Sequence, residues 1–594
     1  MKPTNTDDPS YFHKVVDCQW ACPAHTPVPE YIRLIAEKRY TDAYMINWHS
    51  NVFPGILGRT CDRPCEPACR RGRIEEQPVA ICRLKRVAAD YKSDIRDRIP
   101  EVPKKKNGKH IALIGAGPAA LTVARDLLPL GYEITLFERD AVSGGAMRTQ
   151  IPRFRLPIEV LNEELNYVLD MGVNCRFGEE ITSMKSVMSE GYDAIFIGTG
   201  APLGKWLDLP GHSDAADNIH TGIEWLANVA FEHVTSIGKK VIVLGGGNTA
   251  MDCCRTSKRI GGKDVSVVVR SGFDDMKASP WEIEDAIAED IPILNFHVPK
   301  RYIVENGKLV AMEFEKVRKE VDENGRRQLI PTGEEPAIIP CDDVICAIGQ
   351  ENSFPWIERD LGIEFDKWEV PVLNKATYQS THENVFFGGD AAFGPDNIIT
   401  AVAHGHDAAV SIHMSCEGQD INRRPDPLTN LSSQKMGIHQ WSYDNDISAD
   451  FRFAVPHADK EQTLNDINVE VELGFDEQLA LNETQRCLNC DVQTVFTDKL
   501  CIECDACVDI CPTDCITFTQ NSEESELRLD MLSPAENTEQ DLYVSGTLTT
   551  GRIMAKNEDL CLHCGLCAER CPTNAWDMHK YLFNTAKAQD SCQS

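Results

Sequence analysis

Two runs of cysteines near the C-terminus have the spacing of an iron–sulfur protein. The first run is Cys501, Cys504, Cys507 and Cys511 followed by Pro512, and the second is Cys561, Cys564, Cys567 and Cys571 followed by Pro572. This C-x2-C-x2-C-x3-C-P phrase is typical of two-cluster bacterial ferredoxins, in which the fourth cysteine of each run ligates the other cluster. Zinc sites lack the third closely spaced cysteine and the trailing proline. The runs therefore predict two [4Fe–4S] centres and single-electron chemistry.

A glycine-rich phrase further upstream predicts a nucleotide site. Residues 110–117 read HIALIGAG, a buried strand that leads into the phrase GAGPAA. In this G-x-G-x-x-A phrase Gly115 permits a tight turn, Gly117 lets a pyrophosphate approach the backbone, and the small Ala120 lets helix and strand pack closely. The following helix, 119–130, directs its positive end toward the phosphates. The next strand, GYEITLFE, ends at Glu138, where an acid can hold ribose hydroxyls.

The same phrase returns as KVIVLGGGNTAMD at residues 240–252. The second strand of this unit, DVSVVVRS, ends at Arg270, where the first unit has an acid. An acid there favours a free 2′-hydroxyl, whereas an arginine accommodates a 2′-phosphate, so we expect NADP(H) rather than NAD(H). The alternative is that Arg270 is a solvated charge at a strand end. The residues expected at this site are Gly245, Gly247, Asn248, Thr249, Ala250, Arg270 and Lys277.

Two further phrases complete the first fold around a flavin. AIFIGTG at 194–200 is an apolar strand ending in small residues, and VFFGGD at 385–390 places an acid at a strand end ahead of a second helix. Such an acid can bond the ribityl chain, and the helix N-terminus can stabilise negative charge on the reduced ring. The second unit is then inserted into the first at about 225–345. The residues expected to bind the flavin are Gly115, Gly117, Ala120, Glu138, Gly145, Gly200, Gly389, Asp390 and Ile398.

Composition limits the choice of partners and compartment. The net charge of −32 at pH 7 argues against nucleic acid or an anionic membrane as a partner. No apolar run approaches the ~20 residues that a membrane span requires. The opening MKPTNTDDPS does not read as a signal peptide. Because thiols that bind iron need a reducing compartment, we expect a cytoplasmic protein.

Together these phrases resemble the small-subunit family of bacterial glutamate synthase, which also forms the N-terminal part of dihydropyrimidine dehydrogenase and the large subunit of NADH-dependent ferredoxin–NADP oxidoreductase. The resemblance covers about residues 15–415 and includes CQWACPAHTPVPEYIRLIAEKRY, GRTCDRPCEPACRRG, PVAICRLKRVAAD, both glycine loops and VFFGGDAA. It implies FAD on the first Rossmann fold, NAD(P)H on the second, and iron–sulfur clusters in a helical N-terminal domain. It also implies that Arg270 and Lys277 hold the NADPH 2′-phosphate, although Ser271 departs from the second basic residue common after this arginine.

The N-terminus departs from the family pattern, which opens with an R-C-L-x-C phrase. Here that phrase appears far downstream, as Arg486-Cys487-Leu488-Asn489-Cys490. We expect the C-terminal segment to fold back so that these two cysteines complete two N-terminal clusters. The alternative is a single N-terminal cluster with both cysteines free or disordered. A non-cysteine ligand in one family cluster leaves the role of Cys82 open. The candidate ligands are Cys18, Cys22, Cys61, Cys65, Cys69, Cys82, Cys487 and Cys490.

We therefore predict an α/β protein with two nested Rossmann-like dinucleotide-binding domains. A helical N-terminal iron–sulfur domain and a C-terminal bacterial ferredoxin-like α+β domain complete the chain. The expected boundaries are 1–105 for the helical domain, 106–224 and 346–415 for the FAD domain, 225–345 for the NADP(H) domain, 416–485 for a linker, and 486–594 for the ferredoxin-like domain.

The cofactor set predicts the order of electron flow. A nicotinamide exchanges hydride, a [4Fe–4S] cluster exchanges single electrons, and a flavin does both, so the order is NADP(H), FAD, clusters, partner. No catalytic side chain is expected. Because the sequence offers no domain for an organic substrate, we expect a hetero-oligomer serving a larger catalytic redox subunit, of the 2-oxoacid oxidoreductase or glutamate synthase type. The alternatives are a free-standing NAD(P)H:ferredoxin oxidoreductase and a redox-sensing or cluster-scaffold protein.

Overall fold

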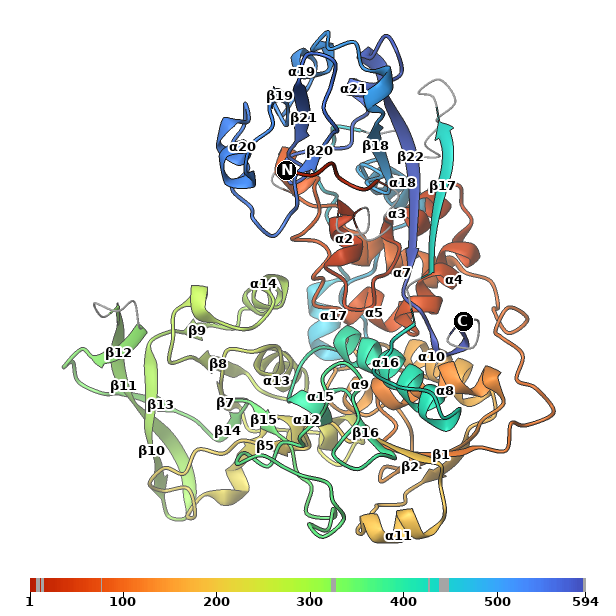
Figure 1. Cartoon of the computed structure of the whole chain (residues 1–594). Helices are drawn as coiled ribbons and strands as arrows, with labels where there is room; N and C mark the ends of the chain where they lie inside the picture. Colours follow the sequence, from red (N-terminus) through yellow and green to blue (C-terminus); the bar gives the residue numbers. More distant parts are fainter. Residues whose placement is uncertain are drawn as a thin grey trace. The chain divides into compact units, whose positions relative to one another are not determined.

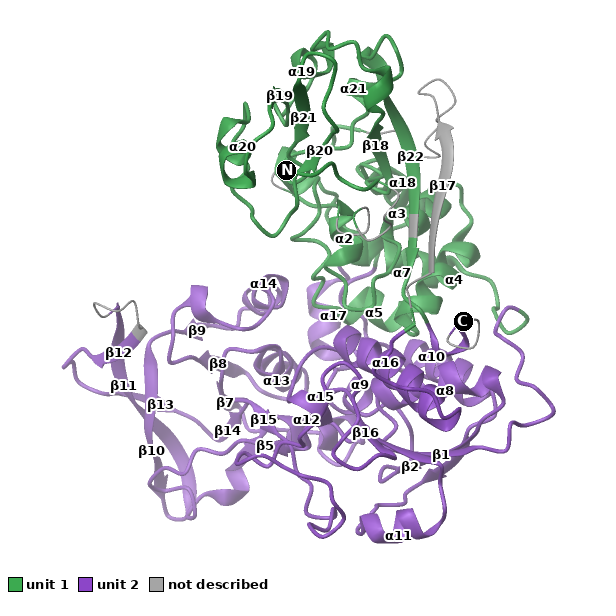
Figure 2. Ribbon diagram, viewed as in Figure 1, with its two compact units in different colours: residues 1–97, 425–455, 474–586 green, residues 98–424, 456–473, 587–594 purple. Residues whose placement is uncertain are grey.

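The computed structural model describes residues 1–6, 11, 15–75, 77–321, 327–425, 428–436 and 448–590 (Figure 1). The chain divides into two compact units, coloured separately in Figure 2. Unit 1 comprises residues 1–97, 425–455 and 474–586, and unit 2 comprises residues 98–424, 456–473 and 587–594. The stretch that we predicted as a linker contributes helix α17 (Lys460–Asn465) to unit 2 and helix α18 (Glu477–Thr484) to unit 1.

The first Rossmann sheet of unit 2 is parallel, in the order β16-β4-β1-β2-β3. Its strands are β1 (His110–Ile114), β2 (Glu133–Glu138), β3 (Asn174–Phe177), β4 (Ala194–Ile197) and β16 (Val385–Phe387). Helices α8 (Pro118–Leu127) and α16 (Ile398–Cys416) pack against each other. The other helices are α9 (Ala146–Thr149), α10 (Ile158–Leu169), α11 (Met184–Ser189) and α15 (Asp390–Phe393). Strands β1 and β4 are buried almost throughout, as expected for a parallel sheet covered on both faces.

The second sheet of unit 2 is also parallel, in the order β6-β14-β7-β8-β9. Its strands are β6 (Ile219–Thr221), β7 (Lys240–Leu244), β8 (Asp264–Val268), β9 (Ile293–Leu294) and β14 (Asp343–Cys346), so the sheet begins ahead of the predicted boundary at 225. Helices α12 (Gly222–Ala230), α13 (Asn248–Arg259) and α14 (Pro280–Ala288) accompany it. Short strands β5 (Leu203–Gly204) and β15 (Gln350–Glu351) pair where the chain passes between the two folds.

An antiparallel meander extends from the second fold. It consists of β10 (His297–Glu305), β11 (Lys308–Val321), β12 (Arg327–Pro331) and β13 (Ala337–Pro340). Met312 and Phe314 of β11 are fully buried in a cluster that includes Val344 of the parallel sheet. The meander is therefore part of the core of this fold.

The N-terminal part of unit 1 is helical. Its helices are α2 (Asp17–Trp20), α3 (Val28–Ala36), α4 (Tyr40–Asn51), α5 (Pro54–Thr60), α6 (Gly72–Glu75) and α7 (Ile81–Tyr91). Helix α7 is buried along its whole length from Ile81 to Ala89, and α18 packs against both α3 and α7. Residues more than 380 positions downstream thus belong to this helical domain.

The remainder of unit 1 has the ferredoxin-like α+β form. One sheet has the order β19-β21-β20 and another the order β17-β22-β18. Their strands are β17 (Leu428–Met436), β18 (Val492–Phe496), β19 (Ile516–Gln520), β20 (Tyr543–Val544), β21 (Arg552–Lys556) and β22 (Trp576–Asn584). Helices α19 (Ala506–Asp509), α20 (Glu524–Asp530) and α21 (Leu566–Arg570) connect them. Within the described residues, no helix combines the length and apolar character needed to cross a bilayer.

Candidate functional site

A cavity of about 390 Å³ lies at the carboxyl edge of the first Rossmann sheet in unit 2. Gly115 has φ +98°, and a Cβ there would lie 2.6 Å from the carbonyl oxygen of Gly198, so the turn requires glycine. Helix α8 begins after Gly117 without a side-chain cap, which leaves its positive end for an anion. The predicted flavin-site residues that line the cavity are Gly115, Gly117, Glu138, Gly145, Gly200, Gly389, Asp390 and Ile398.

Ala120 does not line the cavity but packs behind it. A Cβ on Gly198 would lie 3.4 Å from the Cβ of Ala120, which is itself fully buried. This matches the packing role that the sequence predicts for the third small residue of the loop.

Two acids are fixed at the cavity wall. The carboxylate of Glu138 accepts the N–H groups of Ala116 (2.8 Å) and Asp140 (3.0 Å), and burial raises its pKa. Burial, together with the charge of Asp396, raises the pKa of Asp390 to about 6. Helix α16 starts beside them, capped by the Asn397 side chain, which accepts the Thr400 N–H at 2.9 Å. Two acids in the lining of the cavity suit the ribose and ribityl hydroxyls of FAD.

The second glycine loop joins β7 to α13. Gly245 has φ +135°, and a Cβ there would lie 2.1 Å from the carbonyl oxygen of Ala347. No atom lies within 4 Å of the position that a Cβ would take on Gly247, so this side of the loop is open. Helix α13 begins at Asn248, runs on through Thr249 and the buried Ala250, and has no side-chain cap. The loop therefore offers an uncapped helix end and an open backbone, as a pyrophosphate requires.

Both predicted 2′-phosphate ligands are exposed cations. Arg270 follows β8, and among the described residues its side chain makes no hydrogen bond or ion pair. The backbone N–H of Lys277 donates to the carbonyl oxygen of Gly246 at 2.9 Å, which holds this lysine beside the loop. Asn248 ties the same segment down, because its side-chain oxygen accepts the Ser279 N–H at 2.8 Å. Within the described part of the chain, the arrangement leaves two unpaired positive charges beside the glycine loop.

Alanine substitutions at the two glycines of this loop are expected to have different effects. Gly245→Ala is expected to cost about 3 kcal/mol of stability or more, because the new Cβ meets a backbone oxygen at a strained φ. Gly247→Ala is expected to leave thermal unfolding unchanged and to weaken NADPH binding by about tenfold or more, since its methyl group occupies the path of the phosphates. NADPH titration beside a melting curve checks both, and native-like affinity in Gly247→Ala would contradict the assignment.

The ferredoxin cysteines of unit 1 form two groups that exchange one member. One small cavity, which we call cage C, is lined by Cys501, Cys504, Cys507 and Cys571. A second, cage D, is lined by Cys511, Cys561, Cys564 and Cys567, and also by Cys515, which lies outside the two spaced runs. The fourth cysteine of each run thus lies with the three leading cysteines of the other run, which is the arrangement that two [4Fe–4S] clusters require.

The downstream R-C-L-N-C phrase reaches the N-terminal cysteines. A third cavity in unit 1, cage A, is lined by Cys18, Cys69, Cys487 and Cys490. The guanidinium of Arg33 on α3 donates to Oδ1 of Asp491 at 2.8 Å and to Oδ1 of Asn489 at 3.2 Å. Both charged partners are more than nine-tenths buried, so the phrase is anchored against α3.

The remaining predicted ligands lie together around one lysine. In this group, cage B, the interaction of Cys82 with Cys61 and Cys65 lowers the pKa of Cys82 and raises the pKa of the other two thiols. Burial alone would lower the pKa of Lys85, but the thiols of Cys82, Cys61, Cys65 and Cys22 raise it above its ordinary value. Every cysteine predicted as an iron ligand therefore lies with three other candidate ligands, and the structure gives Cys82 a place in cage B.

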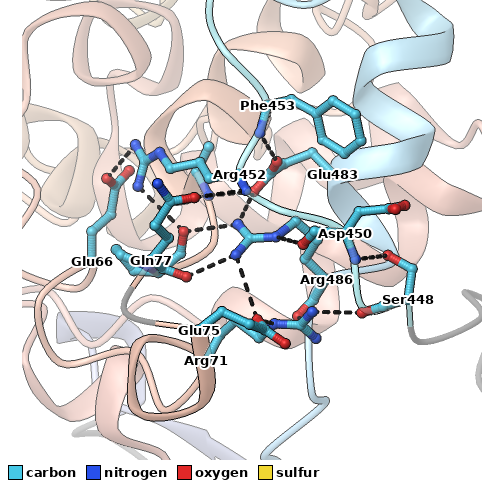
Figure 3. A network of polar contacts seen from close by, with 12 residues as sticks. Glu66, Arg71, Glu75, Gln77, Ser448, Asp450, Arg452, Phe453, Glu483 and Arg486 are labelled. Atoms are coloured by element: carbon cyan, nitrogen blue, oxygen red, sulfur yellow. Dashed lines mark hydrogen bonds and ion pairs between the residues drawn. The ribbon is translucent and has the colours of Figure 1, made fainter.

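A buried polar network holds the downstream segment on the N-terminal loop (Figure 3). Arg486, fully buried, donates to the carbonyl oxygens of Asp450 (2.9 Å), Pro78 (2.9 Å) and Gln77 (2.7 Å). It also pairs at 2.9 Å with Glu483, whose carboxylate accepts the N–H of Ala80. Outer contacts of the same network join Arg452 to Glu66 and Arg71 to Ser448. Arg486 thus positions the cysteine that follows it.

Loss of this arginine is expected to open cage A. Arg486→Met leaves Glu483 as an unpaired buried carboxylate, which typically costs about 3–5 kcal/mol. We expect a lower melting temperature and reduced iron content. Arg39→Met is the matched control, because Arg39 makes its ion pairs at the surface and its loss is expected to change neither quantity. Full iron content in Arg486→Met would contradict the positioning role.

Sequence reasoning missed the buried lysines beside the cages. Lys556, 1% exposed, borders cage D and contacts Thr494 Oγ1 (2.9 Å) and Glu558 Oε1 (2.8 Å). Lys85 is 3% exposed and follows Cys82 by three residues on α7. Residues three apart share a helix face, and that spacing was the available signal for Lys85. The sequence gave no such signal for Lys556, because β21 reaches cage D through tertiary packing.

Three family models match this chain. The pyridine nucleotide-disulphide oxidoreductase model matches residues 109–405, and the model described as dihydropyrimidine dehydrogenase domain II, 4Fe-4S cluster, matches residues 12–96. A 4Fe-4S dicluster domain model matches residues 500–575. The matched ranges contain the two glycine loops, most of the N-terminal candidate ligands and both ferredoxin runs.

Curated relatives extend across most of the chain. The NADP(+)-dependent formate dehydrogenase subunit beta of Moorella thermoacetica is 33% identical over 503 residues, which cover 80% of this chain and 70% of the relative. The NADPH-Fe(3+) oxidoreductase subunit beta of Geobacter sulfurreducens is 30% identical over 533 residues, covering 82% and 77%. The glutamate synthase (NADPH) small chain of Escherichia coli is 31% identical over 420 residues, covering 66% and 87%.

The fold and sites define a class of protein, a flavin- and NAD(P)-dependent oxidoreductase that carries 4Fe-4S domains. The predictions of fold class, of FAD and NADP as cofactors and of iron–sulfur domains in both the N-terminal and C-terminal regions are confirmed. The chain belongs to the pyridine nucleotide-disulphide oxidoreductase family, and its predicted relationship to glutamate synthase small chains is confirmed.

Proposed function

We propose that this chain is the electron-transfer flavoprotein subunit of a larger NADP-linked redox enzyme. When bound, FAD converts between the two-electron hydride chemistry of NADP(H) and the one-electron chemistry of [4Fe–4S] clusters. The observation that carries the proposal is the grouping of every candidate ligand into cages A to D, each with four of the candidate cysteines. A scaffold or sensor protein would not need two nucleotide loops in addition to such a series.

The shared elements of the cages support a series rather than isolated sites. Cys18 of cage A and Cys22 of cage B lie on the same short segment around α2. Likewise, Cys69 belongs to cage A and Cys65, four residues earlier, to cage B. Cages C and D exchange Cys571 and Cys511. Such sharing holds neighbouring clusters at a fixed separation, which is what efficient single-electron exchange needs.

The nicotinamide end is assigned to NADP(H). Arg270 and Lys277 are exposed and unpaired among the described residues, and Lys277 is held beside the glycine loop by its backbone. A guanidinium binds a phosphate by charge-assisted, often bidentate hydrogen bonds. The chain's own part in hydride transfer is to hold the two rings together, which is positioning rather than acid–base work.

The partner is proposed to be a larger catalytic subunit in a hetero-oligomer. The relatives are beta or small subunits by name, and the two beta subunits span more of this chain than the glutamate synthase small chain does. This favours a formate dehydrogenase or metal-reductase type of partner over glutamate synthase. A reducing compartment suits the free thiols, so we place the complex in the cytoplasm.

An anaerobic activity assay tests the proposal. The purified chain is expected to reduce benzyl viologen with NADPH and to reduce NADP+ with reduced viologen. Absence of both activities in protein with full flavin and iron content would eliminate the electron-transfer function in favour of a scaffold. Co-purification with a large catalytic subunit from the native host then distinguishes the subunit from a free-standing ferredoxin oxidoreductase.

A further inference from the structure

We propose that Arg70 and His563 form a junction that couples cage A to cage D, so that cages B, A, D and C make one continuous series within unit 1. The inference rests on the proposed electron-transfer function and adds the residues that connect its two halves. Cages A and B are already linked because their cysteines lie on the same chain segments, and cages C and D are linked because they exchange Cys511 and Cys571. Without a further link, the N-terminal and ferredoxin pairs would be separate.

Arg70 touches both cages. It follows Cys69 of cage A, is 1% exposed, and lines the cage A cavity. One of its nitrogens, Nη1, donates to the carbonyl oxygen of Glu558 at 2.5 Å and to that of Cys561, a cage D cysteine. Its Nε donates to Asp17, the neighbour of Cys18 in cage A. A single guanidinium thus bonds to backbone carbonyls at cage D and to the residue next to a cysteine of cage A.

The same guanidinium carries a spare donor. Nη2 of Arg70 is buried and has no hydrogen-bond partner among the described residues. Buried donors are rarely left unpaired, and each costs free energy unless something accepts the proton. Because Arg70 lines cage A, a sulfur of a cluster bound there would be an available acceptor. This observation points to a ligand rather than to a purely structural role.

His563 makes a second, independent bridge. It lies between Cys561 and Cys564 of cage D and is fully buried. Its Nδ1 lies 3.0 Å from the carbonyl oxygen of Cys490 in cage A. Since a carbonyl can only accept, Nδ1 carries the proton and donates it to this bond. The backbone N–H of His563 also donates to Cys561 Sγ at 3.4 Å.

The positive charge of Arg70 is what would assist electron transfer between the two cages. Thiolate cages that hold clusters are anionic, and two such groups at close range oppose the arrival of an electron on either one. The buried cation of Arg70 between them offsets this repulsion, and in a low-dielectric interior the effect is large. A guanidinium is not deprotonated in proteins, so the side chain of Arg70 stays charged. With both clusters bound, one electron would pass from the cluster of one cage, which would be oxidised, to that of the other, which would be reduced, and Arg70 and His563 would keep their protons.

Substitution of Arg70 tests the junction in the full-length, cofactor-loaded protein. In Arg70→Met, an EPR-monitored titration with dithionite is expected to show the clusters of cages A and D harder to reduce. Their reduced-to-oxidised ratio at a fixed potential should fall about tenfold or more, since a buried unit charge has been removed. Spin–spin interaction between the two clusters should also weaken. Arg70→Lys keeps the charge and is expected to restore the ratio.

Arg73→Met is the matched control. Arg73 tethers the same loop to the carbonyl oxygen of Asp559 but is one-third exposed, so its loss is expected to leave both potentials unchanged. If Arg70→Met fails to hold iron, His563→Leu provides the second test and should weaken the spin–spin interaction at full iron content. Unchanged potentials and coupling in iron-replete variants would overturn the junction. Because dithionite replaces NADPH here, this outcome is distinct from failure of the viologen assay.

Discussion

Replacing Cys487 and Cys490 together by alanine is expected to remove one complete cluster. The native chain should contain about sixteen irons, four in each of four cages, and the double variant about twelve. The physical reason is that cage A would keep two thiols, Cys18 and Cys69, too few to hold a four-iron cluster. Iron and acid-labile sulfide are measured against flavin after anaerobic purification, so that incomplete recovery does not distort the ratio.

The control is a cysteine that lies outside the cages. Cys254 is buried on α13, where its thiol contacts the carbonyl oxygen of Met251 at 3.2 Å. Cys254→Ala is expected to keep the native iron content. A native chain with only about twelve irons, or a double variant that retains about sixteen, would sink the fold-back assignment. Loss of about eight irons would instead mean that cage A is needed to assemble cage B.

The cages show which part of the site was readable from the sequence. Spacing within a ferredoxin run reflects local geometry, so the ligands of cages C and D, including their exchange of Cys511 and Cys571, follow from the pattern. Cage A is different, because Cys69 and Cys487 meet only through tertiary folding. The sequence supplied a count of ligands and a displaced phrase, but the division of cysteines between cages A and B depended on packing.

Long-range contacts explain the other omissions. The guanidinium of Arg486 donates to the backbone carbonyl oxygens of Gln77, Pro78 and Asp450. Because every residue has such a carbonyl, no pattern in the sequence predicts these acceptors. Strand β17 comes from the stretch predicted as a linker, yet it pairs with β22. Both glycine loops, in contrast, were predicted, since a strand, a tight turn and a helix are determined by neighbouring residues.

Removing Arg270 is expected to change the choice between nicotinamide cofactors. Arg270→Ala should weaken NADPH binding by about tenfold to a hundredfold, the range for a charged hydrogen-bonded pair. Binding of NADH should be nearly unaffected. The reason is that the arginine is expected to contact only the 2′-phosphate, the group in which the two cofactors differ. Lys277→Ala is expected to act in the same direction with a smaller loss, because an ammonium binds phosphate as a point charge. The comparison is made on kcat/KM for each cofactor in the viologen assay.

Lys319→Ala separates this effect from a general loss of positive charge. Lys319 lies on β11 of the same fold, but its ammonium is paired with Asp275 at 2.7 Å, so its loss should leave the NADPH to NADH ratio unchanged. Raising ionic strength should reduce the preference for NADPH in the native chain and have little effect in Arg270→Ala, since exposed charges are screened by salt. Equal losses for NADPH and NADH in Arg270→Ala would mean that the arginine supports the loop rather than the 2′-phosphate. In that case the cofactor preference would have to come from elsewhere in the second Rossmann fold.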